Sequence, residues 1–205
     1  MNLRSCVTSE TPESSAGKAE IRSRVRLARA DQDPATAARR DEARTSRVLA
    51  ACRRLNPGWI ACYVSVDPEP STSDLLAELA DWGVGILLPW LGRGSHKPSW
   101  AEWAGEPMTS GFAGIPMPTS PRLDATALSR ADLIVLPGLA GTREGVRLGQ
   151  GGGWYDQALA HARPDTPRWL LLNDAEVVAA LPHDPWDQPV TALVTERRWI
   201  ECGGE

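Results

Sequence analysis

A glycine-rich segment between a predicted strand and a predicted helix constrains the fold of this chain more than any other feature. The apolar run Asp132-Leu133-Ile134-Val135-Leu136-Pro137 precedes it, and a helix-like stretch from Trp154 to Ala162 follows it. Four of the five residues Gly149-Gln150-Gly151-Gly152-Gly153 lack a Cβ atom. Backbone N–H groups can therefore converge on a bound anion, to which the start of the next helix adds partial positive charge. We predict a site for a nucleotide phosphate here, with a tight structural turn as the alternative.

Charged residues on either side of the glycines suit a magnesium nucleotide. Arg147 supplies a cation at the mouth of the loop, and Asp156 lies in the first turn of the following helix. An aspartate in that place can hold a divalent cation that shares the oxygens of the anion, or it can simply stabilise the helix N-terminus. The segment is not a Walker A motif, because no Gly-Lys-Ser/Thr follows, and it is not G-x-G-x-x-G. The sequence therefore predicts a phosphate and magnesium site of another kind.

Apolar, strand-like runs alternate with helix-like segments along the rest of the chain. The predicted strands are 59–66, 85–91, 133–136, 168–172 and 190–195, the last of them extended by 199–202. The predicted helices are 18–30, 33–55, 71–82, 154–162 and 174–181. This alternation predicts an α/β fold in which helices cover both faces of a mostly parallel sheet. Ligands of such sheets bind at the carboxyl ends of the strands, where Glu69 and the glycine-rich segment are expected.

The start of the chain and one long middle segment lack these patterns. Residues 1–15 are predicted to be a disordered extension, followed by a single domain of residues 16–205. Residues 92–121, rich in Gly, Pro, Ser and Trp, are predicted to form a long irregular loop that closes over a ligand. In the first helix, we expect Ile21, Val25 and Leu27 to be buried. The second helix is expected to begin at Asp33-Pro34, because aspartate is a good N-cap and proline suits the first helical position.

The composition argues against several classes of protein. The 205 residues carry a formal net charge of −4, with a pI near 5.5, which argues against nucleic-acid binding as the main role. No run of 18 apolar residues is present and the first 17 residues are polar, so we expect neither a membrane partner nor a signal peptide. The four cysteines and three histidines are scattered, which indicates reduced thiols and no zinc site. We therefore expect a cytoplasmic protein.

The glycine-rich segment and four other motifs resemble the 5-formyltetrahydrofolate cyclo-ligase family, whose members are also called methenyltetrahydrofolate synthetases. The signature of that family resembles Leu136-Pro137-Gly138-Leu139-Ala140, Gly145-Val146-Arg147-Leu148-Gly149 and Gly151-Gly152-Gly153-Trp154-Tyr155-Asp156. The other similar motifs are Lys18-Ala19-Glu20-Ile21-Arg22, the strand and turn from Tyr63 to Thr72, Gly114-Ile115-Pro116-Met117-Pro118, and 187–196. The likeness runs in order from about residue 16 to residue 200.

The resemblance implies a three-layer α/β/α fold like that of sugar-phosphate isomerases and CoA transferases, and an enzyme that uses ATP and Mg²⁺. The implied substrate is 5-formyltetrahydrofolate, whose formyl oxygen attacks the γ-phosphate of ATP. Attack by N10 and loss of phosphate then give 5,10-methenyltetrahydrofolate. We expect a monomer that binds small molecules only. Two other functions stay open: a non-catalytic protein that binds folate or nucleotide, and an ATP-using enzyme for another small substrate.

Residue roles follow from the same resemblance. It implies ATP contacts by Lys18, Arg22, Arg147, Leu148, Gly149, Gly151, Gly152, Gly153 and Tyr155, of which Arg147 and Lys18 are the expected catalytic cations. It implies folate contacts by Val64, Glu69, Gln150 and Trp154, and magnesium ligation by Asp156 and Asp187. Each has a plainer interpretation: solvated helix charges for Lys18 and Arg22, a helix cap for Glu69, a turn residue for Asp187, and core anchors for Trp154 and Tyr155.

Four positions depart from the pattern of the family, the mildest of them Trp154, which replaces a usual tyrosine. Thr142 and Thr191 stand where aspartates are usual, so two carboxylates near the expected phosphate and metal region are absent. Trp90 follows Pro89 where a basic residue is common.

Overall fold

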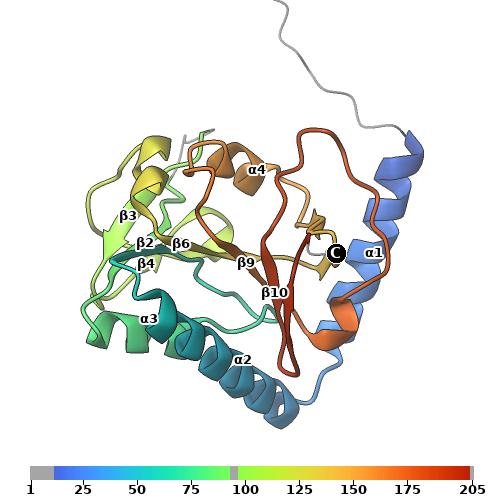
Figure 1. Cartoon of the computed structure of the whole chain (residues 1–205), viewed down its shortest axis with the longest axis horizontal. Coiled ribbons are helices and arrows are strands. Elements are labelled where there is room, and N and C mark those ends of the chain that lie inside the picture. Colours follow the sequence, from blue (N-terminus) through green and yellow to red (C-terminus); the bar gives the residue numbers. More distant parts are fainter. Residues whose placement is uncertain (1–11, 93–96, 204–205) are drawn as a thin grey trace, which may run out of the picture.

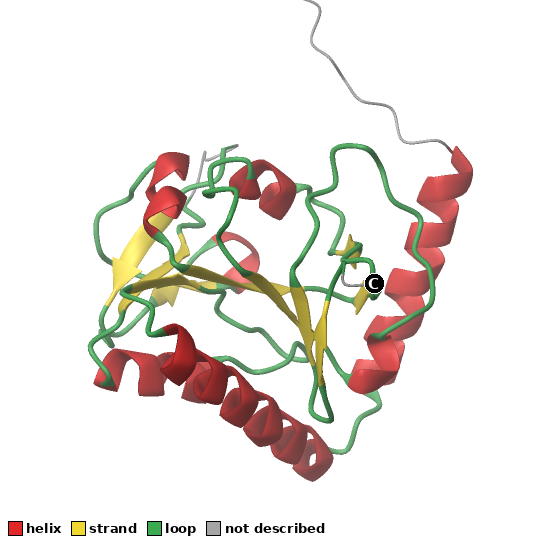
Figure 2. Ribbon diagram, in the orientation of Figure 1, coloured by secondary structure: helices red, strands yellow, loops and turns green. Residues whose placement is uncertain are grey.

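Helices lie on both faces of a central sheet in the computed structural model, which describes residues 12–92 and 97–203 (Figures 1 and 2). The seven strands of this sheet are β1 (Trp59–Ala61), β2 (Gly85–Pro89), β3 (Trp100–Trp103), β6 (Leu133–Pro137), β9 (Arg168–Leu171), β10 (Ala192–Val194) and β11 (Trp199–Glu201). Two small sheets pair β4 (Thr109–Ser110) with β5 (Pro116–Met117), and β7 (Ala140–Gly141) with β8 (Arg147–Leu148). The α-helices are α1 (Pro12–Ala30), α2 (Pro34–Leu55), α3 (Ser73–Asp81) and α4 (Trp154–Leu159). Three 3-10 turns are η1 (Phe112–Gly114), η2 (Ala125–Arg130) and η3 (Asp174–Glu176).

The main sheet has the order β11-β10-β9-β6-β1-β2-β3. Its five inner strands, from β10 to β2, run parallel, and the edge strands β11 and β3 pair antiparallel with their neighbours. The predicted, mostly parallel α/β sheet is therefore confirmed. Because the inner strands are parallel, their carboxyl ends all meet at one edge of the sheet, where the connecting loops can form a site.

Both faces of the sheet are buried, which explains why the strands are almost continuously apolar. Leu133 and Val135 of β6 pack in one core cluster with residues of α2 and α3, whereas Ile134 and Leu136 pack in a second cluster with η2 and α4. This alternation follows from the two-residue period of a strand. The molecule thus has three layers, with α2 and α3 on one side of the sheet and α4 and η2 on the other (Figure 1).

Helix α1 packs beside the main sheet rather than on one of its faces (Figure 1). Its partly buried Ile21 lies against a small apolar cluster of Ala140, Leu148 and Leu181, which joins the helix to the β7–β8 pair. Val25 is buried, as predicted, but Leu27 is 69% exposed, so the prediction for Leu27 was wrong. Residues 21 and 25 are four apart and share one helix face, which residue 27 does not.

Helix α2 begins and ends where the sequence predicted. The Asp33 carboxylate accepts a hydrogen bond from the Thr36 N–H at 2.8 Å, and Pro34 follows at the first helical position. Asn56 ends the helix with a left-handed φ of 49°. No helix in the described part of the chain is both long enough and apolar enough to cross a membrane.

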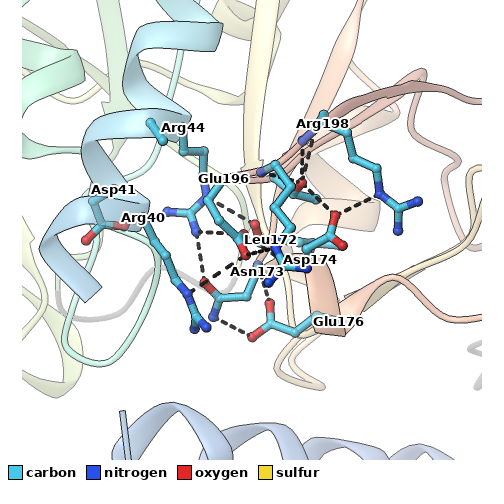
Figure 3. A network of polar contacts seen from close by, with 12 residues as sticks. Arg40, Asp41, Arg44, Leu172, Asn173, Asp174, Glu176, Glu196 and Arg198 are labelled. Carbon is cyan, nitrogen blue, oxygen red and sulfur yellow. Dashed lines mark hydrogen bonds and ion pairs between the residues drawn. The ribbon is translucent and has the colours of Figure 1, made fainter. Parts of the chain in front are cut away.

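A buried polar network attaches α2 to the carboxyl end of β9 (Figure 3). The fully buried Arg44 donates from Nε to the Leu172 carbonyl at 3.0 Å and from Nη2 to Asn173 Oδ1 at 2.9 Å. Asn173 in turn donates from Nδ2 to Glu176 Oε1 at 2.9 Å. Glu176 forms a buried ion pair with Arg29 of α1, at 2.7 Å from Oε2 to Nη2. The network therefore links both long helices to the edge of the sheet where the strands end.

Several predicted segments differ in extent from the structure. The first strand ends at Ala61 instead of residue 66, and the predicted helix 174–181 is only the turn η3. Within 92–121, β3 pairs antiparallel with β2, so the prediction of a wholly irregular loop was wrong there. The side chain of Trp100 in β3 is fully buried and packs in one core cluster with Leu87 and Leu128, which explains why this segment joins the sheet. Residues 1–11 of the predicted extension, Cys6 included, lie outside the described residues, and α1 begins at Pro12.

Candidate functional site

A cavity of about 1120 Å³ opens beside the carboxyl ends of β1, β2 and β6. Its wall combines one face of α1, the segments that follow these three strands, the loop from β8 into α4, and the turn before β10. Every predicted site residue lines it: Lys18, Arg22, Val64, Glu69, Arg147, Leu148, Gly149, Gln150, Gly151, Gly152, Gly153, Trp154, Tyr155, Asp156 and Asp187. The fold therefore brings together residues that are far apart in the sequence.

Two arginines of α1 hold the glycine-rich loop through its backbone carbonyl groups. Arg22 donates from Nε to the Gly149 carbonyl at 3.0 Å, and Arg26 donates from Nη2 to the Gln150 carbonyl at 3.4 Å. Because a peptide is planar with its C=O and N–H opposed, the N–H groups of Gln150 and Gly151 point away from α1. No backbone N–H of residues 150–153 donates to another described residue. The loop thus has N–H donors available for an anion.

Arg147 is a buried cation with an unused donor. Its side chain is 5% exposed, and Nη2 lies 2.6 Å from Asp156 Oδ1. Its guanidinium also lies 5.8 Å from the centre of the Tyr155 ring. Among the described residues, Arg147 Nε is buried and finds no hydrogen-bond partner. A buried donor without a partner costs about 1–3 kcal/mol, so Arg147 is able to gain stability from a ligand oxygen.

Lys18 is also buried, and two carboxylates surround its ammonium group. Nζ lies 2.5 Å from Asp184 Oδ2 and 3.3 Å from Asp187 Oδ2. Burial on its own would lower the pKa of Lys18, but the hydrogen bonds and charges of Asp184 and Asp187 outweigh burial and raise that pKa. Lys18 therefore stays protonated at neutral pH. Its plainer interpretation, a solvated helix charge, does not describe a side chain that is 5% exposed.

The carboxylates of Asp156 and Asp187 each keep one oxygen without a hydrogen-bond partner among the residues that the structure describes. Asp156 uses Oδ1 for Arg147 and for the Gln188 N–H, at 2.6 and 3.2 Å. Asp187 uses Oδ2 for Lys18 and for the Asp184 N–H, at 3.3 and 2.9 Å. No group of three or more His, Cys, Asp or Glu side chains suited to a metal occurs in the described residues. Two carboxylates fit Mg²⁺, which usually binds one or two of them together with phosphate oxygens and waters.

The other side of the cavity is mostly apolar and carries one carboxylate. Glu69 accepts from the Val66 N–H through Oε2 at 3.2 Å and from Gln150 Nε2 through Oε1 at 3.4 Å. Trp154 lies edge-on to the buried Trp100, with 5.2 Å between ring centroids, so it anchors the core and lines the cavity at once. The remaining apolar wall includes Tyr63, Val64, Trp90, Leu91, Phe112 and Ile115. Such a wall suits a flat, partly aromatic ligand.

Residues 14–196 match the sequence profile of the family described as 5-formyltetrahydrofolate cyclo-ligase. A protein of Mycolicibacterium smegmatis with that name is 31% identical over 168 residues, which cover 80% of this chain and 87% of the relative.

The chain belongs to the 5-formyltetrahydrofolate cyclo-ligase family.

Solved structures of this family have the same fold. A 5,10-methenyltetrahydrofolate synthetase of Aquifex aeolicus superposes with a TM-score of 0.79 at 25% identity, covering 92% of this chain and 94% of the other. A 5,10-methenyltetrahydrofolate synthetase of Mycoplasma pneumoniae has a TM-score of 0.70 at 15% identity, covering 87% and 98%, and it supports the fold alone. The chain is accordingly an enzyme of the ligase class with the fold of this family.

Thr142 and Thr191, which stand where relatives usually have aspartates, both lie outside the cavity wall. Thr142 is buried, and its hydroxyl accepts a hydrogen bond from the Val146 N–H at 3.3 Å. The Thr191 hydroxyl accepts from the Arg168 N–H at 2.9 Å and donates to the Arg168 carbonyl at 3.2 Å. Both threonines therefore have local hydrogen-bond partners, and neither substitution removes a carboxylate from the cavity wall.

Sequence reasoning missed three charged residues beside the site. Asp184 pairs with Lys18, and Arg26 donates to Gln150. Arg168 lies near Arg147: burial is the main cause that lowers the pKa of Arg168, and the charge of Arg147 lowers it further. Helical spacing alone suggests Arg26, because it continues the face of Lys18 and Arg22 four residues further on. Asp184 and Arg168 carry no such pattern, because only the tertiary fold places them near their partners.

Proposed function

We propose that this enzyme closes 5-formyltetrahydrofolate to 5,10-methenyltetrahydrofolate with ATP, releasing ADP and phosphate. The observation that carries the proposal is the Arg147 guanidinium in the cavity wall, beside a loop whose N–H groups have no partner in the described part of the chain. Such preorganised donors stabilise the charge that develops on a transferred phosphoryl group. The names of the relatives supply the folate substrate and the cyclisation.

We assign the two sides of the cavity to different substrates. Lys18, Arg22, Arg147 and the glycine-rich loop form the cationic side, which we assign to the phosphates of ATP. Glu69 and the apolar wall form the other side, which we assign to the pterin, since a carboxylate can accept two N–H bonds from a 2-amino-4-oxo ring. We also assign folate contacts to Gln150, whose side chain donates to Glu69, and to Trp154, which lines the cavity. The cavity volume of about 1120 Å³ exceeds the range of about 300–1,000 Å³ that is typical of pockets for one drug-sized ligand, which supports a site for two ligands.

The reaction then needs positioning more than covalent chemistry by the protein. The formyl oxygen of the folate attacks the γ-phosphorus of ATP, and the bond between γ-phosphorus and the bridging oxygen of ADP breaks. N10 attacks the resulting imidoyl carbon and gives up its proton to a phosphate oxygen, and the C–O bond breaks as phosphate leaves. Arg147 and Lys18 neutralise charge on the phosphate oxygens during both steps. Magnesium held by Asp156 and Asp187 would supply further charge neutralisation.

The setting of the enzyme follows the same proposal. We propose a cytoplasmic monomer that acts on small molecules, without nucleic acid or membrane as partner. The free thiols of Cys52, Cys62 and Cys202 support a reducing compartment, and the net charge of −4 argues against nucleic-acid binding.

One absorbance assay tests the proposed reaction. The protein is mixed with 5-formyltetrahydrofolate, ATP and Mg²⁺, and the near-ultraviolet absorbance of the methenyl product is followed, with ADP measured in parallel. We expect equal amounts of methenyl product and ADP. Binding of both ligands without product would refute the proposal in favour of a non-catalytic binding protein. ADP release that occurs only with a different small substrate would refute it in favour of another ATP-using enzyme.

A further inference from the structure

Asp184 is a buried carboxylate that contacts the site without lining it. Its Oδ2 lies 2.5 Å from Lys18 Nζ, and the residue is 8% exposed. Asp187, three residues later, lies 3.3 Å from the same ammonium and does line the cavity. Lys18 therefore stands between a hidden carboxylate, which it contacts closely, and an accessible one, which it contacts weakly.

The turn that carries both carboxylates is closed by its own hydrogen bonds. The Asp184 N–H donates to Asp187 Oδ2 at 2.9 Å, and the Asp187 N–H donates to the Asp184 carbonyl at 3.0 Å. These bonds fix the backbone of the turn and the side chain of Asp187, while Lys18 contacts the side chain of Asp184. The helix of Lys18 is attached elsewhere, through Arg22 and Arg29. Hence neither the turn nor the Lys18 ammonium is free to move far. The charges of Lys18, Asp184 and Asp187 then decide which of the two carboxylates is available to a cation.

One cation between two carboxylates leaves a net charge of −1 in this cluster. Lys18 is satisfied by its short contact with Asp184, so Asp187 can release its longer contact at little cost. Without the charge of Asp184, the ammonium would have Asp187 as its one anionic partner among the described residues and would compete there with any metal. Both this competition and the lost negative charge would weaken cation binding at Asp187.

We propose that Asp184 is a positioning residue that holds the Lys18 ammonium and thereby keeps Asp187 available to the divalent cation of the metal–nucleotide substrate. The inference rests on the proposed function for the identity of that substrate. Partners of metal ligands outside the direct coordination shell commonly change metal affinity about 10–100-fold when they are mutated.

The test compares Asp184→Asn with wild type, because asparagine keeps the shape and removes the charge. Isothermal titration calorimetry measures the binding of the ATP analogue AMP-PNP with excess EDTA, and electron paramagnetic resonance measures Mn²⁺ binding in the presence of AMP-PNP. We expect Mn²⁺ affinity to fall about tenfold. Affinity for the metal-free nucleotide should stay equal or rise, because one negative charge is removed near its phosphates. A purely structural role would weaken both kinds of binding together.

Two further variants make the comparison sharper. Asp184→Glu keeps the negative charge that Asp184→Asn removes, so it should keep most of the Mn²⁺ affinity of the wild type. Glu176→Gln is the matched control, because it breaks another buried ion pair of α1, with Arg29, yet touches no cavity residue. It should lower thermal stability and leave Mn²⁺ affinity unchanged. If Asp184→Asn fails to fold, as judged by circular dichroism, Asp184→Ser provides a smaller neutral side chain that can still accept from Lys18.

The outcomes separate this inference from the proposed function. A folded, neutral variant at position 184 with Mn²⁺ affinity within twofold of wild type would overturn the inference, as would an equal loss of metal-free nucleotide binding. Absence of Mn²⁺ binding by the wild-type complex would overturn it as well. Absence of methenyl product, with the Mn²⁺ difference present, would overturn the proposed reaction and leave the role of Asp184 standing.

Discussion

At the scale of single residues, the most informative side chain is Arg147. Its guanidinium is removed from water, its ion pair with Asp156 uses one nitrogen, and its Nε has no partner in the described structure. Buried charges are stable only when partners satisfy them, so this residue is poised for an anionic ligand. A phosphate in the cavity would add hydrogen bonds to this guanidinium, since Arg147 lines the cavity wall.

We predict that Arg147→Ala lowers kcat/KM for 5-formyltetrahydrofolate cyclisation by about 10²–10³-fold, because it removes a donor that acts on transition-state charge. Steady-state absorbance kinetics measure this effect. The control is Arg54→Ala, which removes an exposed cation at the end of α2, far from the cavity wall. Equal rates for the two variants would contradict a phosphate role for Arg147.

Glu69 tests the folate side of the site. Its two oxygens accept N–H donors from Val66 and Gln150, and a pterin would present a similar pair of donors. We predict that Glu69→Gln raises the KM for 5-formyltetrahydrofolate about 10–100-fold, because the amide replaces an acceptor with a donor. The KM for ATP should change less than threefold. A rise in the KM for ATP alone would show that Glu69 belongs to the nucleotide side.

At the scale of elements, the glycine-rich loop depends on backbone geometry as well as on open space. Gly151 has a φ of 106°, and a Cβ there would lie 3.2 Å from the Arg22 guanidinium carbon. Gly152 has no positive φ, and a Cβ there would meet nothing within 4 Å. Two neighbouring glycines therefore have different reasons to be in the loop.

We predict that Gly151→Ala destabilises the protein by about 1–3 kcal/mol, because a side chain is strained at that φ and crowds Arg22. Gly152→Ala, the matched control, should change the free energy of unfolding by less than about 0.5 kcal/mol. Urea denaturation followed by circular dichroism gives both values. Similar losses of stability in the two variants would contradict the prediction, because they would show that the positive φ of Gly151 and its contact with Arg22 do not distinguish it from Gly152.

Elements with strong local signals were predicted well, and the others were not. Asp33, Pro34 and Asn56 are local capping signals, and α2 has the predicted limits. The predicted helix 174–181 failed because Asn173 and Glu176 form a closed capping turn that serves Arg29 and Arg44 instead of starting a long helix. Those two arginines are more than 125 residues away in the sequence, so no local pattern could indicate this arrangement.

At the scale of the whole molecule, partly exposed carboxylates connect distant segments and make stability depend on pH. Asp132 accepts from the Trp59 and Gly58 N–H groups at the start of β1 and from Arg163, and these bonds lower its pKa although burial opposes them. Partial burial alone would raise the pKa of Asp174, but hydrogen bonds from Arg198 and Thr195 outweigh it and lower that pKa.

A carboxylate whose pKa is lower in the folded state stabilises the fold above its unfolded pKa, which is about 3.9 for aspartate. We predict a nearly constant urea midpoint from pH 7 to pH 5 and a fall as the pH drops below about 4, through the folded pKa values. Asp132→Asn should be less stable than wild type at pH 7 and should approach it at pH 2.5. A constant difference between the two proteins across this range would contradict the assignment.

The sequence by itself determined the order of elements, the family motifs and the chemical types in the site, because each depends on local spacing. The alternation of apolar runs and helices was enough to predict a mostly parallel sheet, and the motifs around the glycine-rich segment were enough to identify the family. Tertiary structure decided which charges meet: Lys18 with Asp184 and Asp187 from the other end of the chain, and Arg26 with Gln150. The energy of an electrostatic contact depends on the distance between the charges in space. Spacing along the sequence does not give that distance, because it is set when the parallel strands bring their carboxyl ends to one edge of the sheet.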